Sequence, residues 1–118
     1  MEPLTVGVPK EIKAEEHRVA ITPDGVRELL HHGSTVLVEA GAGIDSSIPD
    51  ADYERAGATI VQAADEVWKR AELICKVKEP LASEFAYFRP GLVLFTYLHL
   101  AAYPAVADAL LNSGVSGV

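Results

Sequence analysis

The sequence predicts an α/β fold, an open and mostly parallel sheet with helices on both faces. Short β-prone runs alternate with helix signals along the whole chain, and no repeat, low-complexity tract or linker interrupts the alternation. Such alternation is typical of βαβ units, whose crossovers are right-handed and whose strands run parallel. The 118 residues are 49% hydrophobic and 23% charged, ordinary proportions for one globular domain with a real core.

The predicted strands are short runs rich in β-branched and apolar residues. They are Leu4–Val8, Thr35–Glu39, Thr59–Val61, Leu73–Lys78 and Val93–Tyr97. The last four residues, 115–118, read as the opening of a further strand that is cut short. Because a parallel sheet rarely finishes on an abandoned strand, we expect the chain to be the front part of a longer protein.

Capping residues predict helices between these strands. Thr22 as N-cap, Pro23 in the first turn and Gly33 as terminator predict a helix whose inward positions are Val26, Leu29 and Leu30. Asp50 is expected to cap a short helix that ends at Gly57.

Helical spacing predicts two more helices. In one segment the apolar residues recur at i, i+3, i+4 and i+7, at Ala64, Val67, Trp68 and Ala71. The last helix is expected to begin near Pro104 and to stop at Gly114, with three residues facing the core: Val106, Ala109 and Leu110.

Composition excludes several classes of function. The formal net charge of −7 argues against nucleic-acid binding, which needs a basic patch. The single cysteine, Cys75, has no internal partner for a disulfide, which favours a reducing compartment. The N-terminus has no apolar h-region, and no run reaches the roughly 18 apolar residues of a membrane span. We therefore expect a soluble cytoplasmic protein.

Three residues with binding or proton-transfer chemistry each follow a predicted strand. Arg18 lies in the loop after the first strand, Lys78 closes the fourth, and His99 comes after the fifth. Because ligands of open α/β sheets bind outside the carboxyl ends of the strands, we expect these side chains to converge. Two cations suit a carboxylate, and an imidazole can move a proton near neutral pH. The pattern predicts a small carboxylate substrate whose reaction includes proton transfer.

Each of these residues also has a structural interpretation. Arg18 could belong to a surface ion pair. Alternation places Lys76 and Lys78 on the same face of the sheet, where both could be lysines that protect an edge strand from aggregation. His99 could be a packing residue in an apolar run. Lys76, deeper in the strand than Lys78, is expected to be structural.

The segment EAGAG at residues 39–43 invites comparison with dinucleotide-binding loops. The third glycine of that fingerprint would fall at Ser46, and the next helix begins too late for its N-terminus to meet a pyrophosphate. A turn-forming loop is the better interpretation. No pair of His, Cys or carboxylate residues has the spacing of metal ligands.

Four segments of the chain match one family, in order and at appropriate intervals: VGVPKEIKAEEHRVAITPDGVRELLHHG, VLVEAGAG, ELICKVKEP and FTYLHLA. Together they closely resemble the N-terminal part of the bacterial alanine dehydrogenases. The resemblance implies that residues 1–118 form a Rossmann-like or flavodoxin-like substrate domain. It also implies an NAD-binding Rossmann domain beyond Val118, reversible oxidative deamination of L-alanine to pyruvate and ammonia, and a hexamer.

The resemblance also implies roles for the three candidate residues. Arg18 and Lys78 would hold the substrate and polarise it, and His99 would be the acid/base. The alpha subunit of nicotinamide nucleotide transhydrogenase shares much of the pattern but lacks a segment like FTYLHLA, and saccharopine dehydrogenase is a looser match. Without an NAD domain the chain is expected to be inactive alone, so a non-catalytic remnant is a further alternative.

Overall fold

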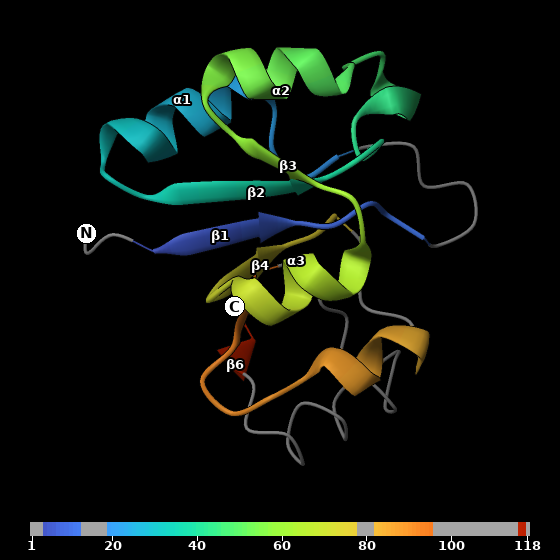
Figure 1. Ribbon diagram of the computed structural model, residues 1–118. Helices are drawn as coiled ribbons and strands as arrows, with labels where there is room; N and C mark the ends of the chain where they lie inside the picture. Colours follow the sequence, from blue (N-terminus) through green and yellow to red (C-terminus); the bar gives the residue numbers. More distant parts are fainter. Residues whose placement is uncertain (1–3, 13–18, 78–81, 96–115, 118) are drawn as a thin grey trace.

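The computed structural model describes residues 4–12, 19–77, 82–95 and 116–117 (Figure 1). In this part of the chain the strands form a six-stranded sheet in the order β3-β2-β1-β4-β5-β6. All neighbouring strands pair in parallel, which confirms the predicted fold class. The strands are Thr5–Val8, Thr35–Glu39, Thr59–Val61, Leu73–Cys75, Val93–Phe95 and Ser116–Gly117, numbered β1 to β6.

Helices cover both faces of the sheet (Figure 1). One face carries α1 and α2, and the other carries α3 and the 3-10 helix η2, which span Pro23–His31, Asp50–Ala56, Ala64–Arg70 and Ala82–Tyr87. The core accordingly has two layers. Val36 and Val38 of β2 belong to the cluster under α1 and α2, and Leu37 between them belongs to the cluster with α3. This burial of both strand faces is typical of parallel sheets.

Helix α1 begins and ends as its capping residues predict. The hydroxyl of Thr22 accepts a hydrogen bond from the Gly25 amide at 3.4 Å, and Pro23 occupies the first turn. Val26 is completely buried, while the predicted inward residues Leu29 and Leu30 are half-buried against the same cluster.

Helix α2 corrects one prediction. Its N-cap is Pro49, and Asp50 is the first helical residue rather than the cap. The Asp50 carboxylate instead accepts a hydrogen bond from the Gly41 amide at 2.9 Å. The helix ends before Gly57, as predicted, because Gly57 has the positive φ of 106° that favours glycine.

Helix α3 packs its predicted apolar stripe against the sheet. Val67, Trp68 and Ala71 are all 0% exposed, which confirms the helical spacing. The Trp68 ring stacks on Tyr87 of η2 at a centroid distance of 5.4 Å. The sequence did not predict η2, since residues 82–87 carry no helical periodicity.

The end of the chain is only partly described. The predicted helix near Pro104, with Val106, Ala109 and Leu110, lies outside the described residues. Strand β6, Ser116–Gly117, pairs in parallel with β5, which confirms the expectation that a further strand begins near the end of the chain.

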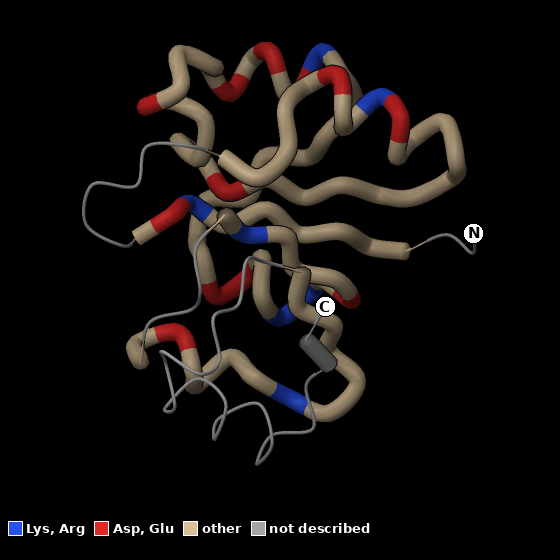
Figure 2. Tube along the Cα trace, turned by 180° about the vertical axis from the view of Figure 1, so that it is seen from behind, with Lys and Arg blue, Asp and Glu red and all other residues tan. Residues whose placement is uncertain are grey.

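Surface charges are mixed along the described part of the trace, where Lys and Arg positions are interspersed with Asp and Glu (Figure 2). On α1, Arg27 pairs with Asp24 at 2.8 Å, and on α3, Arg70 pairs with Glu66 at 2.7 Å. Within the described residues, no helix has the length and apolar character needed to cross a membrane.

Candidate functional site

The strand order reverses between β1 and β4, and this reversal defines a crevice. Strands β2 and β3 lie on one side of β1, whereas β5 and β6 follow β4 on the other side. Connections from the carboxyl ends of β1 and β4 therefore leave in opposite directions, which opens a space between them. Ligands of doubly wound sheets bind in such a space.

A cavity of about 400 Å³ lies at this edge of the sheet. One wall is formed by residues 19–22, which lead from the loop after β1 into α1. The opposite wall is formed by residues 75–77 at the end of β4, and Ser46, Ile48 and Phe95 complete the lining. The cavity is large enough for a small ligand and falls within the usual range for such sites.

The three predicted site residues, Arg18, Lys78 and His99, lie outside the described residues. Their neighbours in the sequence nevertheless line this one cavity. Val19 directly follows Arg18, and Val77 directly precedes Lys78. Phe95 of β5 precedes the segment that carries His99. The fold thus brings the flanking segments together, and the convergence of the three side chains stays a prediction.

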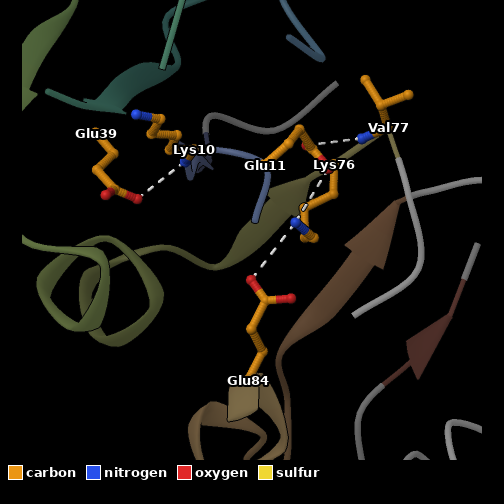
Figure 3. Close-up of polar contacts among 6 residues, drawn as sticks. All are labelled: Lys10, Glu11, Glu39, Lys76, Val77 and Glu84. Carbon is orange, nitrogen blue, oxygen red and sulfur yellow. Dashed lines mark hydrogen bonds and ion pairs between the residues drawn. The ribbon is translucent and has the colours of Figure 1, made fainter. Parts of the chain in front are cut away.

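A buried charge cluster lies beside the cavity, formed by Glu11, Lys76 and Glu84 (Figure 3). Lys76 Nζ is 3.2 Å from Glu11 Oε1 and 3.5 Å from Glu84 Oε2. The second oxygen of Glu11, Oε2, accepts a hydrogen bond from the Val77 amide at 2.9 Å. The cluster joins the segment after β1 to the end of β4 and to η2.

Lys76 is therefore a structural residue, as expected. Its side chain is only 1% exposed although the residue contributes to the cavity lining. Its ammonium is engaged by two carboxylates of the described residues, those of Glu11 and Glu84. The edge-strand interpretation is wrong, because β4 lies between β1 and β5 in the sheet. A substrate carboxylate at this edge would need a different cation.

Sequence reasoning missed the partners Glu11 and Glu84. The available signal was Lys76 itself, since a lysine in a buried strand needs an opposite charge. Glu11 lies 65 residues away in the sequence, so only the strand order could identify it.

The glycine loop at residues 39–43 folds as the predicted turn. Gly41 has a φ of 82°, and its amide is bound by Asp50. The amides of Ala42 and Ile44 donate to the carbonyls of Glu39 and Gly41 at 3.0 and 3.2 Å. These donors are therefore engaged within the loop, and the loop does not fit a nucleotide phosphate.

Two titratable side chains around the cavity, Tyr53 and Cys75, have raised pKa values, which favour their neutral forms. Burial, reinforced by the charge of Asp50, raises the pKa of Tyr53 to about 12. The Tyr53 hydroxyl donates to the carbonyl of Ile21, a lining residue, at 2.7 Å. Burial also raises the pKa of the Cys75 thiol to about 11, so this lining residue is a poor nucleophile at neutral pH. Among the described residues, no group of His, Cys, Asp and Glu could hold a metal ion.

Comparison with known proteins identifies the family of this chain. Residues 7–118 match the family described as Alanine dehydrogenase/PNT, N-terminal domain. The chain belongs to this family. It is 55% identical over 115 residues to the alanine dehydrogenase of Bacillus subtilis, an alignment that covers 98% of this chain and 30% of that protein.

Solved structures with the same fold include two kinds of family member. An L-alanine dehydrogenase matches with a TM-score of 0.93 and 44% identity, covering 97% of this chain and 31% of the other. The transhydrogenase from Sinorhizobium meliloti matches with a TM-score of 0.88 and 37% identity, covering 96% and 32%. The chain therefore spans about a third of the length of these relatives.

Proposed function

We propose that residues 1–118 form the substrate domain of an NAD-dependent L-alanine dehydrogenase, which interconverts L-alanine with pyruvate and ammonia. The observation that carries this proposal is the cavity of about 400 Å³ where the strand order reverses, since its lining includes Val19 and Val77, the sequence neighbours of Arg18 and Lys78. The 55% identity with the Bacillus subtilis alanine dehydrogenase supports the same reaction.

The proposal gives each candidate residue a task. Arg18 and Lys78 bind the carboxylate of pyruvate or alanine and orient the molecule, because paired cations make strong, charge-assisted hydrogen bonds. His99 donates a proton to the developing hydroxyl of the carbinolamine and takes it back in the reverse direction. Lys76 takes no part in binding, since Glu11 and Glu84 hold its ammonium.

The remaining features of the proposal concern the complete protein. NAD would supply redox chemistry from a separate Rossmann domain, and no described residue of this chain is assigned to it. The resemblance implies a homo-hexamer in the cytoplasm, with small molecules rather than nucleic acid or membrane as partners.

The transhydrogenase alpha subunit is the second candidate. The shared fold favours it, with a TM-score of 0.88. The lower identity, 37% against 44% for the solved alanine dehydrogenase, and the presence of His99 in FTYLHLA favour alanine dehydrogenase. A non-catalytic remnant that only binds carboxylates is the third candidate.

The carboxylate site can be tested on the 118-residue chain by NMR titration with pyruvate. Arg18→Ala and Lys78→Ala should each weaken binding roughly 10- to 100-fold, the effect of losing a hydrogen bond to a charged group. Arg27→Ala is the matched control, because Arg27 is exposed and pairs with Asp24 on α1. Absence of pyruvate binding, or an equal loss in the control, would contradict the proposed site.

A chimera tests the reaction itself. The matching 115-residue segment of the Bacillus subtilis alanine dehydrogenase is replaced by the corresponding residues of this chain, and NADH oxidation is followed with pyruvate and ammonia. The alanine dehydrogenase proposal predicts a clearly active chimera. A folded, hexameric but inactive chimera would favour the transhydrogenase or the remnant.

A further inference from the structure

We infer that Glu11 is a positioning residue for the substrate site: its buried carboxylate holds the Val77 amide, directly before Lys78, to the segment that follows β1. This inference rests on the proposed function. It assigns a role to a side chain that lies outside the expected set of Arg18, Lys78 and His99.

The first argument is where Glu11 sits in the chain. Glu11 follows β1, and seven residues later comes Arg18. Its Oε2 binds the amide of Val77, the residue before Lys78, at 2.9 Å (Figure 3). One carboxylate thus joins the segment that follows β1 to Val77, and in the sequence these two points lead on to the proposed substrate cations, Arg18 and Lys78.

The second argument is that each carboxylate oxygen of Glu11 is held by a partner of its own. Oε1 faces Lys76 Nζ at 3.2 Å while Oε2 faces the Val77 amide. The Glu11 side chain is only 2% exposed, and Glu84 holds Lys76 from the other side at 3.5 Å. A buried carboxylate held at two points cannot move without separating opposite charges in a medium of low dielectric constant, which is costly.

The third argument comes from the other end of the same two strands. At the amino end, Glu72 precedes β4 and its Oε1 accepts a hydrogen bond from the Thr5 amide of β1, also at 2.9 Å. That contact has the same chemistry and length but is exposed to solvent. Backbone pairing and this exposed contact already join β1 to β4 at the amino end, so we assign the buried Glu11 contact to the geometry of the carboxyl end.

The experiment compares pyruvate affinity in Glu11→Ala, Glu11→Gln and Glu72→Ala variants of the 118-residue chain. Glu11→Ala should weaken binding by at least about tenfold, the effect of losing a charge-assisted contact. Glu11→Gln should fall between Glu11→Ala and the unmodified chain, since its amide oxygen can still accept from Val77. Glu72→Ala should change the affinity by less than about twofold, because it acts at the opposite edge.

Hydrogen exchange at the Val77 amide supplies a second readout that does not need pyruvate. Glu11→Ala should speed this exchange selectively, relative to amides of β1 and β2, whereas Glu72→Ala should not. Equal pyruvate affinity in Glu11→Ala and the unmodified chain, or unchanged exchange at Val77, would overturn the inference. If Glu11→Ala fails to fold, the same two measurements on Glu11→Gln decide, with a partial loss expected.

The outcomes separate this inference from the proposed function. An unmodified chain that does not bind pyruvate contradicts the proposed function. A chain that binds pyruvate and is indifferent to Glu11 contradicts only the positioning role. Parallel losses in the Glu11 and Glu72 variants would show that general destabilisation explains both.

Discussion

The two edges of the central strand pair, β1 and β4, differ in how polar groups are used. At the amino edge, Glu72 binds the Thr5 amide in solvent. At the carboxyl edge, Glu11 binds the Val77 amide within a buried cluster that includes Lys76 and Glu84. Buried ion pairs often add little stability, because desolvation offsets their attraction. A buried cluster with fixed contacts at the edge that borders the cavity is what the inferred positioning role of Glu11 requires.

The largest difference between the edges should appear in catalysis. In the chimera, His99→Ala should lower turnover by roughly 10²- to 10⁴-fold, the usual contribution of a positioned acid/base. His31→Ala is the matched control, since His31 is exposed at the end of α1, next to the amino edge. Steady-state kinetics with pyruvate and ammonia measure both. Near-normal turnover in His99→Ala at every pH would make His99 a packing residue.

The second-largest difference between the two edges of the sheet should appear in the reactivity of a cysteine thiol. The pKa of Cys75 is raised from 9.0 to about 11 by burial, so at pH 8 its thiolate fraction is roughly a hundredfold below that of an exposed cysteine. Iodoacetamide should modify it correspondingly slowly, as followed by mass spectrometry. The matched control is a Thr35→Cys, Cys75→Ser variant, because Thr35 is exposed at the amino edge.

The same shift fixes the sign of a pH effect on stability. Between pH 9 and about 11 the unfolded chain releases the thiol proton while the folded chain retains it. The contribution of Cys75 to the free energy of unfolding is thus fully present below pH 9 and is lost as the pH rises toward 11. Cys75→Ser should flatten this part of the stability profile. Fast alkylation of folded Cys75 at pH 8 would contradict both expectations.

The sequence predicts the layers of the fold better than its polar connections. Alternating strand and helix signals suffice for the parallel sheet, and Thr22 with Pro23 suffices for the start of α1, because these signals are local. The partner of Asp50 could not be predicted, since a carboxylate at a helix start can bind its own helix or, as here, the Gly41 amide.

The candidate site likewise has a part that the sequence predicts and a part that it does not. The strand ends could be assigned to one edge from the sequence, because parallel strands share their carboxyl edge. The role of Glu11 could not, because its contact with Lys76 spans 65 positions and depends on the reversal of strand order between β1 and β4. Non-local polar contacts require the topology before they can be identified.

The smallest expected effect concerns a single hydroxyl at each edge. Tyr53 donates to the carbonyl of Ile21, a cavity residue, at 2.7 Å, and at the amino edge the Ser34 hydroxyl accepts from the Leu4 amide at 3.3 Å. Tyr53→Phe and Ser34→Ala should each lower the free energy of unfolding by about 1 kcal/mol, the usual net value of one hydrogen bond. Urea denaturation measures this loss.

Only Tyr53→Phe should also weaken pyruvate binding, by a few-fold, because the Ile21 carbonyl belongs to the wall that follows Arg18. The effect should be constant between pH 6 and 9, since a pKa of about 12 keeps the Tyr53 hydroxyl protonated throughout that range. The measurement is an NMR titration of each variant at both pH values. If Ser34→Ala weakens binding as much as Tyr53→Phe does, affinity follows overall stability, and the functional distinction between the two edges is wrong.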